Sequence, residues 1–242
     1  MLVTGASSGI GRSTAILLSQ LGARLVLVAR NQDGLHETIG AMAGTGHHPA
    51  PFDLERVDEI QPWFNQLVQT TGPLDGLVCA AGMSSLRPLR VLDIAHFDKV
   101  MRINCYSAVA LTTAFCRKRA RQPEASVVLV ASVAGLRASP ARSAYSASKG
   151  ALIAFARSAA VELAPVGVRL NCVAPAYVKT PMYDTAMREL SPEKVELLVR
   201  ATQPLGLGTP LDVAHAIAFL LADTGRWITG SVLAVDGGYT AQ

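Results

Sequence analysis

The sequence predicts an α/β fold with one doubly wound parallel sheet of about seven strands and helices on both faces. Short apolar stretches alternate with helix-length amphipathic stretches along the chain, and this alternation favours parallel strands joined by right-handed crossovers. Half of the 242 residues are apolar and 17% are charged, which suits a sheet covered on both faces. We therefore expect a single domain over residues 1–242, without a linker or an internal repeat.

The first predicted unit is a strand at 1–4 that passes through a glycine-rich turn, Thr4-Gly5-Ala-Ser-Ser-Gly9-Ile10-Gly11, into a helix. Gly5 allows a tight exit from the strand. Gly9 and Gly11 lack Cβ atoms, so that backbone can approach a pyrophosphate closely. The free N–H groups at the helix start then face that anion. The turn therefore predicts dinucleotide binding, although alone it is also compatible with a plain turn.

The remaining predicted elements continue the alternation. Strands are expected at 24–29, 49–52, 74–80, 125–131, 168–173 and 232–235. Helices are expected up to about residue 43 and at 54–70, 93–119, 143–164 and 210–222, with two short helices in an insertion at 180–204. Ligands of an open parallel sheet bind beyond the carboxyl ends of its strands. The residues at or just beyond such ends are Gly5, Arg30, Asp53, Gly82, Ser132 and Pro175.

Composition excludes several functional classes. The net charge of +4 comes from dispersed basic residues with few aromatics, so we expect no nucleic-acid binding. No apolar run reaches membrane-spanning length, and we expect no membrane association. The four cysteines lack metal-binding spacing and lie in apolar stretches. We therefore interpret them as reduced, buried thiols of a cytoplasmic protein, without a metal site. They are Cys79, Cys105, Cys116 and Cys172.

Tyr145 and Lys149 share one face of a predicted helix, and Ser132 ends a strand on the expected ligand side. A nearby ammonium favours the phenolate, so we expect a lowered pKa for the Tyr145 hydroxyl. Tyr145 would then donate a proton to a carbonyl or accept one from an alcohol, while Ser132 bonds to the same oxygen. The alternative is an exposed tyrosine–lysine pair without a catalytic role.

Several motifs occur together in one order: Thr4-Gly5-Ala-Ser-Ser-Gly9-Ile-Gly11, Cys79-Ala-Ala-Gly82, Asn104, Ser132, Tyr145-Ser-Ala-Ser-Lys149 and Asn171-Cys-Val-Ala-Pro175. With these motifs the chain resembles the short-chain dehydrogenase/reductase family over its whole length, and most of all its 3-oxoacyl-[acyl-carrier-protein] reductases. The resemblance implies a single Rossmann-type domain. It also implies hydride transfer between a nicotinamide cofactor and a carbonyl or secondary alcohol, with a 3-oxoacyl thioester as one candidate substrate.

The resemblance also implies residue roles. Tyr145 would be the acid/base, Lys149 would lower its pKa and bind the nicotinamide ribose, and Ser132 would polarise the substrate carbonyl. Asn104 would hold a proton-relay water, or would simply be an amide satisfied by its surroundings. The implied cofactor-binding residues are Gly5, Ser7, Ser8, Gly9, Ile10, Gly11, Arg30, Asp53, Leu54, Ala81, Gly82, Tyr145, Lys149, Pro175, Val178 and Thr180.

Arg30 decides the predicted cofactor. A free ribose 2′-hydroxyl favours an acid at the end of the second strand, but here Arg30 follows the strand and the next acid is Asp33. A guanidinium suits a 2′-phosphate because it is always charged and bonds in a bidentate manner. We therefore predict NADP, with NAD as the less favoured cofactor and with Ser7, Ser8 and Arg12 assisting. The alternative is that Arg30 is solvated and only opens the next helix.

The substrate pocket is expected between the loop 134–143, Tyr177 and the insertion 180–204, which we interpret as a substrate lid. Arg137 and Arg142 would attract an acidic substrate, or would remain solvated. Four apolar residues of the insertion either line the pocket or pack between its two helices; these are Met182, Tyr183, Met187 and Leu190.

Partners are less defined by the sequence. The basic run 117–121 would steer an acyl carrier protein towards the chain, or would only complement the end of its helix. Val166 stands where carrier-protein reductases often have a basic residue, which weakens the carrier hypothesis. Broad apolar faces on helices 93–119 and 143–164 predict a homotetramer, with a dimer as the second choice.

Two other functions stay open from the sequence. One is an NAD(P)-dependent dehydrogenase of sugar alcohols, dihydrodiols or other secondary alcohols. The other is a non-catalytic NADP-binding scaffold, which would not require Tyr145 or Lys149, although both are present.

Overall fold

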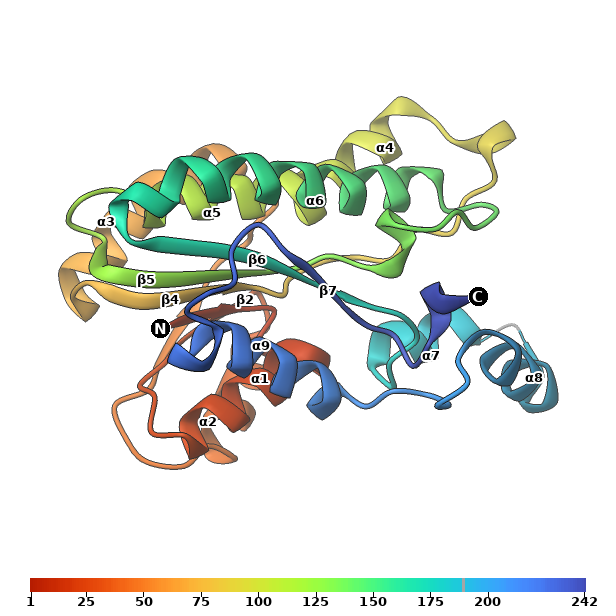
Figure 1. The fold of residues 1–242 in the computed structure, drawn as a ribbon, viewed down its shortest axis with the longest axis horizontal. Helices are drawn as coiled ribbons and strands as arrows, with labels where there is room; N and C mark the ends of the chain where they lie inside the picture. The colour runs from red at the N-terminus through yellow and green to blue at the C-terminus, as the bar shows by residue number, and fades with distance from the viewer. Residues whose placement is uncertain (189) are drawn as a thin grey trace.

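The computed structural model describes residues 1–188 and 190–242. Its seven-stranded sheet has the order β3-β2-β1-β4-β5-β6-β7, and every neighbouring pair is parallel (Figure 1). The order reverses between β1 and β4, so that a crevice forms beyond their carboxyl ends. The predicted fold class is confirmed. The strands are β1 (Leu2–Thr4), β2 (Val26–Ala29), β3 (His48–Pro51), β4 (Leu74–Cys79), β5 (Arg121–Val130), β6 (Val168–Pro175) and β7 (Val232–Val235).

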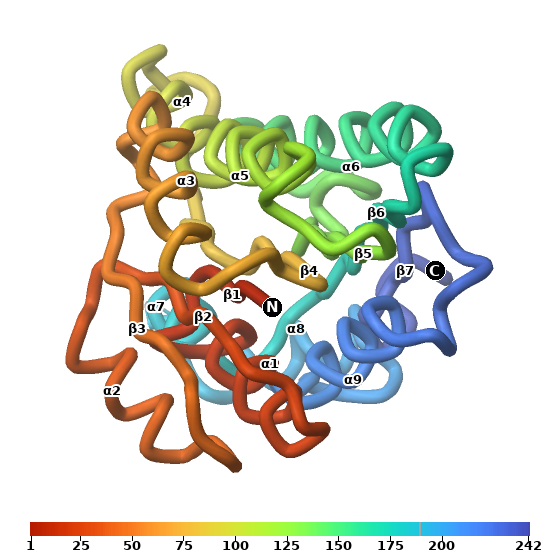
Figure 2. The backbone as a smooth tube through the Cα atoms, turned by 90° about the vertical axis from the view of Figure 1, so that its left-hand side faces the viewer, coloured from red at the N-terminus to blue at the C-terminus, as the bar shows by residue number. Residues whose placement is uncertain are grey.

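Helices cover both faces of the sheet (Figure 2). One face carries α1 (Gly9–Gln20), α2 (Gln32–Gly40) and α9 (Pro210–Leu221). The other carries α3 (Ile60–Thr71), α4 (Ile94–Met101), α5 (Ser107–Phe115) and α6 (Ser143–Leu163). The insertion forms α7 (Pro181–Met187) and α8 (Pro192–Thr202), which lie beyond the carboxyl ends of the strands (Figure 1).

The core consists of two apolar layers, one on each face. Successive strand residues point to opposite faces, so Val127 of β5 packs on the α5 and α6 side while Val128 packs on the α1 and α9 side. Phe64 and Phe115 are fully buried in the first layer. These layers fix the strand ends, and therefore the site that the strand ends carry.

The predicted helix 93–119 is wrong in two respects. It is divided by a π-helical turn, Arg102–Tyr106, and it ends at Phe115. Residues 117–120 of the basic run lie in a turn instead of a helix. Strand β5 begins at Arg121 rather than at residue 125. The guanidinium of Arg121 donates to the carbonyl groups of Gln122, Pro123 and Val166. These bonds hold the chain in the turn and the strand rather than in a helix.

Other boundaries differ by shorter stretches. The predicted helix 54–70 starts later, because Arg56 N–H donates to the Asp53 carbonyl in a turn and a short 3-10 helix, Val57–Glu59, precedes α3. The second strand starts at Val26, and α2 ends at Gly40. Strand ends at the site also shift by one or two residues: β3, β4 and β5 end one residue earlier than predicted, and β6 extends from the predicted residue 173 to Pro175.

Candidate active site

The glycine-rich turn lies in a cavity of about 550 Å³ at the carboxyl ends of β1, β2 and β4. The structure brings most of the predicted cofactor-binding residues together here. Those lining this cavity are Gly5, Ser7, Ser8, Gly9, Ile10, Gly11, Arg30, Asp53, Leu54, Ala81, Gly82 and Thr180.

The backbone of this turn fits a dinucleotide. A Cβ on Gly11 would lie 2.4 Å from the Gly5 carbonyl oxygen. Gly5 has a φ of +65° and packs against the backbone of Ala81. The Thr4 hydroxyl accepts hydrogen bonds from the N–H groups of both Ala80 and Ala81, each at 3.0 Å. Glycine is thus required at both positions, because the start of α1 packs closely on the end of β1 and the end of β1 packs closely on the loop after β4. The free N–H groups at the start of α1 line the cavity with this turn and fit a pyrophosphate.

Two arginines near the turn have different surroundings. Arg12 pairs with Glu37 at 2.8 Å and donates to the Ser7 carbonyl at 2.6 Å. Arg12 is not among the residues lining the cavity, and its help in phosphate binding stays a prediction. Arg30 is exposed and lines the cavity beside Asn31. In the described ranges, no ion pair engages Arg30.

A second cavity, of about 140 Å³, adjoins the first, and residues such as Ile10, Gly82 and Thr180 line both. Ser132, which follows β5, and Tyr145 and Lys149 of α6 line this second cavity together. Pro175 and Val178, the remaining predicted cofactor-binding residues, line it as well. Three of the four sequence-predicted catalytic side chains therefore converge on the small cavity, whereas Asn104 is not among the residues that line either cavity.

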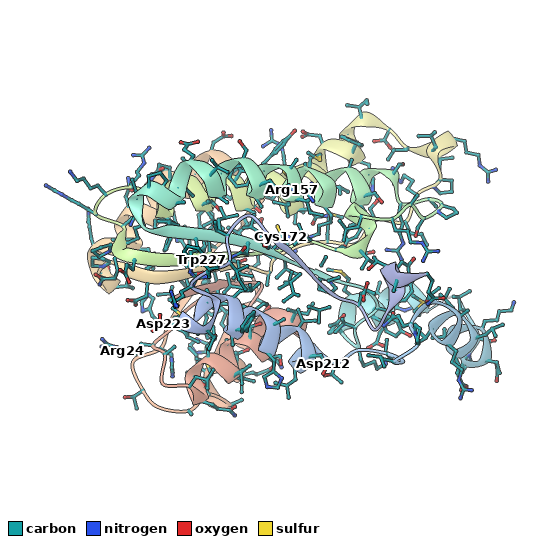
Figure 3. The ribbon with its side chains drawn as sticks, in the orientation of Figure 1. Arg24, Arg157, Cys172, Asp212, Asp223 and Trp227 are labelled. Atoms are coloured by element: carbon teal, nitrogen blue, oxygen red, sulfur yellow. The ribbon has the colours of Figure 1, made fainter. Side chains whose placement is uncertain are left out.

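The Lys149 side chain is buried, and Nζ donates to the Val130 carbonyl at 2.7 Å. Nζ lies 5.9 Å from the centre of the Tyr145 ring. Burial lowers the pKa of Lys149 to about 8. Burial also raises the pKa of the nearby Cys172 thiol to about 12, so this thiol stays protonated at neutral pH. Cys172 lies on β6 beneath α6 (Figure 3).

The expected lowering of the Tyr145 pKa is wrong in this structure. Burial raises the pKa of Tyr145, and the nearby Ser132 hydroxyl and the charge of Arg142 oppose this rise without reversing it. Low-dielectric surroundings disfavour the phenolate. The ammonium of Lys149, the expected cause of a lower pKa, is held by the Val130 carbonyl. The phenol is therefore protonated at neutral pH.

A family model described as enoyl-(acyl carrier protein) reductase matches residues 5–240. The chain is 37% identical to the mouse 3-oxoacyl-[acyl-carrier-protein] reductase, over 98% of this chain and 95% of that protein. It belongs to the short-chain dehydrogenase/reductase family. It is also 35% identical to the cis-4-hydroxycyclohexanecarboxylate dehydrogenase of Sinomonas cyclohexanicum, over 99% and 96% of the two chains.

Structural similarity agrees with this assignment. The crystal structure of a chain described as a short-chain alcohol dehydrogenase, from Sinorhizobium meliloti 1021, superposes with a TM-score of 0.92 at 31% identity, over 100% of this chain and 96% of that chain. The protein is therefore an oxidoreductase of the short-chain dehydrogenase/reductase family, whose members use a nicotinamide cofactor.

In this short-chain dehydrogenase/reductase, Asn104 joins α6 to the loop after β4. Its Oδ1 accepts from Met83 N–H at 2.7 Å, and its Nδ2 donates to the Met83 carbonyl at 3.0 Å and to Ser148 Oγ at 3.1 Å. The side chain is thus satisfied by its surroundings, as the alternative interpretation expected. Holding a relay water stays a prediction for this residue.

Ser132 is positioned by two backbone contacts. Its hydroxyl accepts from Ala134 N–H at 3.1 Å and donates to the Pro175 carbonyl at 3.4 Å. The second bond is long, so the proton can turn towards a substrate oxygen at little cost. Thr180 caps α7 by accepting from Tyr183 N–H at 3.2 Å, and this contact fixes where the insertion begins.

The insertion contributes to the small cavity through α7. Met182, Tyr183 and Met187 line it, whereas Leu190 is not among its lining residues and is 41% exposed. Tyr177 lines the cavity as expected. Sequence reasoning missed Tyr239, whose ring packs edge-on at 6.1 Å from that of Tyr177. No local motif marks Tyr239, because only the return of the C-terminus brings it to the cavity.

Two further observations concern other site types. Within residues 1–188 and 190–242, no cluster of histidine, cysteine or acidic side chains has a metal-binding arrangement. In the same ranges, no helix combines the length and apolar character needed to cross a membrane.

Proposed function

We propose that this chain is an NADP(H)-dependent oxidoreductase that interconverts a small, cyclic secondary alcohol and its ketone. The observation that carries this proposal is the convergence of Ser132, Tyr145 and Lys149 on a cavity of about 140 Å³ that adjoins the dinucleotide-sized cavity. When bound, the cofactor supplies or accepts the hydride.

Three side chains of the chain then transfer the proton, bond to the carbonyl oxygen of the substrate and hold the cofactor. A protonated Tyr145 donates its proton to the carbonyl oxygen during reduction, and its raised pKa keeps that proton in place at neutral pH. Ser132 donates a hydrogen bond to the same oxygen. Lys149 holds ribose hydroxyl groups with the ammonium that now bonds to Val130.

The proposal assigns NADP through Arg30. Its guanidinium lines the large cavity at the end of β2, where the adenine ribose of a dinucleotide lies in this fold class. The neighbouring Asn31 is neutral, so no carboxylate at this strand end repels a 2′-phosphate. The four free cysteines also support a reducing, cytoplasmic compartment as part of the proposal.

The lining of the small cavity supports an apolar substrate, because it includes Met83, Val133 and Val130 beside the reacting groups. The relative that acts on cis-4-hydroxycyclohexanecarboxylate supports a ring substrate. The apolar wall from α7 includes Met182 and Met187, and we propose that α7 closes over the bound ring as a lid.

A 3-oxoacyl thioester is the second candidate, supported by the similarity to the mouse 3-oxoacyl-[acyl-carrier-protein] reductase. The basic run 117–121 does not add to it. That run precedes and begins β5, at the amino ends of the strands, while α7 lies at the opposite end of the sheet (Figure 1). A carrier bound there would lie at the opposite end of the sheet from the small cavity.

Replacement of the proton donor tests the proposal. We expect Tyr145→Phe to lower kcat for ketone reduction by about 100-fold or more, because general acid catalysis typically contributes that much. NADPH binding, measured by the fluorescence of the reduced nicotinamide, should change little. The assay panel holds small cyclic ketones and 3-oxoacyl thioesters.

Tyr106→Phe is the matched control, since Tyr106 is 40% exposed and is not among the residues lining either cavity. Equal turnover by wild type and Tyr145→Phe would refute the role of Tyr145. Tight NADPH binding by a wild type that reduces no member of the panel would favour the non-catalytic scaffold instead.

A further inference from the structure

Arg142 is the one arginine among the residues that line the small cavity. It is half-buried, and within the described residues its guanidinium has neither an ion pair nor a side-chain hydrogen bond. Its charge acts on the two phenols of the cavity, because it opposes the burial-driven rise in the pKa of both Tyr145 and Tyr177. The positive charge is therefore directed at the place where the substrate reacts.

The position of Arg142 does not benefit the local fold. Arg142 is the N-cap of α6, the side chain makes no capping bond, and the first turn of the helix has no acidic residue. A cation at a helix N-terminus opposes the helix dipole. The preceding residue, Ala141, has a φ of +59°, a conformation that alanine rarely adopts. Its carbonyl is held by Arg87 N–H at 2.7 Å.

Strain of this kind persists only where the surroundings enforce it, and it is concentrated at functional sites. The chain thus holds a cation at an unfavourable helix end, behind a strained residue, on the wall of the reaction cavity. A role towards a ligand explains this arrangement better than a role in stability.

The remaining lining gives the chemistry of that ligand. The described lining residues include no aspartate or glutamate, and apart from Arg142 their only cation is Lys149. Lys149 donates a hydrogen bond to the Val130 carbonyl. In the proposed function it binds the ribose hydroxyl groups of the cofactor. Most other walls are apolar or aromatic, among them Met83, Val133 and Met182. The cavity therefore suits an apolar ring that bears one anionic group.

We propose that Arg142 binds a carboxylate of the substrate, so that the enzyme acts on a small alicyclic secondary alcohol or ketone that also carries a carboxylate. This inference rests on the proposed function of the cavity. A guanidinium binds a carboxylate through two parallel hydrogen bonds. This contact would fix the ring so that its hydroxyl carbon faces Tyr145 and Ser132.

The other loop arginine, Arg137, has a different role. It donates to the Tyr239 carbonyl at 2.8 Å and stacks over the Tyr239 ring at 5.3 Å. It supports the wall of the cavity and is not itself a lining residue. The sequence predicted the same role for Arg137 and Arg142, whereas in the structure only Arg142 lines the cavity.

The test compares a carboxylate substrate with its neutral isostere, for example 4-oxocyclohexanecarboxylate and 4-oxocyclohexanecarboxamide. We expect Arg142→Gln to lower the kcat/KM ratio of carboxylate to carboxamide by about 10- to 100-fold, the usual effect of a charge-assisted bidentate pair. Any change in the acidity of Tyr145 affects both substrates and cancels in the ratio. Arg142→Lys should recover part of the loss, because it keeps the charge and loses the planar fork.

Arg137→Gln is the matched control, since it removes one charge from the same loop, and its ratio should equal that of wild type. A binding readout without turnover accompanies the kinetics. With NADP⁺ present, cyclohexanecarboxylate should raise the Tm of wild type more than cyclohexanecarboxamide does, and Arg142→Gln should abolish that difference.

Each other outcome has a defined meaning. A wild type that reduces both ketones, with a ratio that Arg142→Gln leaves unchanged, overturns the inference and leaves the proposed function intact. A wild type that reduces no ketone of the panel overturns the proposed function itself. In a further outcome, the enzyme prefers 3-oxoacyl pantetheine 4′-phosphate to the unphosphorylated thioester and loses this preference in Arg142→Gln. That result would show that Arg142 binds a phosphate, and it would overturn the proposal that Arg142 binds a carboxylate.

Discussion

At the scale of single residues, Arg30 carries the proposed choice between the two nicotinamide dinucleotides. We expect Arg30→Asp to reverse the preference, because the new carboxylate accepts a hydrogen bond from a ribose 2′-hydroxyl and repels a 2′-phosphate. The ratio of NADPH to NADH affinity should fall by about 100-fold, the equivalent of about 2.7 kcal/mol. Fluorescence titration with both reduced cofactors measures this ratio.

Arg24→Asp gives a matched control for the same change in charge. Arg24, labelled in Figure 3, precedes β2 and Arg30 follows it, so the sequence puts the two residues at opposite ends of one strand. If Arg24→Asp shifts the ratio as much as Arg30→Asp, the effect is general electrostatics and Arg30 does not bind the phosphate.

The sequence indicated the residues of the site better than it indicated their electrostatics. Gly5, Ser132, Tyr145 and Lys149 belong to short motifs whose residue types follow from the chemistry, and the structure brings all four to the two adjoining cavities. The direction of the Tyr145 pKa depends on burial, which exists only after β5, β6 and α6 have packed together. No residue spacing contains that information.

At the scale of elements, the π-helical turn between α4 and α5 carries Asn104. We expect Asn104→Ala to lower the free energy of unfolding by about 1–3 kcal/mol, because it leaves partly buried backbone groups of Met83 without their partners. The loop after β4 should then loosen, and since Gly82 and Met83 line both cavities, NADPH affinity should fall as well. Urea unfolding and cofactor titration measure the two effects.

Asn65→Ala is the control within a helix, since the Asn65 amide is exposed and, among the described residues, its side chain bonds only to Gln61. It should change stability by less than about 0.5 kcal/mol. A loss of stability by Asn104→Ala without any loss of cofactor affinity would show that the loop does not depend on this amide.

The same element shows where sequence reasoning fails. The stretch 93–119 has helical periodicity throughout. Its π-helical turn, however, contains Asn104, whose side chain bonds to Ser148 of α6. After α5, the bond from the Arg121 guanidinium to the Val166 carbonyl stops the basic run 117–121 from extending the helix. Both causes are tertiary contacts between residues far apart in the sequence. The predicted strands, in contrast, overlap all of the observed ones, because a short apolar run between two helices of an α/β fold is nearly always a strand of the central sheet.

At the scale of the whole molecule, large apolar side chains are exposed at several places among the described residues, and two of these places, on α6 and beside β7, fit the predicted assembly. On α6, Val161 is 76% exposed. At the β7 edge, Trp227 is 91% exposed and projects beside the last strand (Figure 3), while Leu233 of β7 is 37% exposed. We propose these side chains as association surfaces, because α6 and the last strand are where the sequence predicts contact between copies and because burying a ring as exposed as that of Trp227 favours association. Two different surfaces, each pairing with its own copy about a two-fold axis, generate a closed tetramer.

We therefore predict a homotetramer, to be measured by light scattering on a size-exclusion column. Trp227→Arg and Val161→Lys should each yield a dimer, because each disrupts one pairing and leaves the other, and the double variant should be monomeric. The two dimers should differ in which surface is buried, so that hydrogen exchange protects α6 in Trp227→Arg and β7 in Val161→Lys. A monomeric wild type, or a single variant that is already monomeric, would contradict two independent pairings and leave at most one interface.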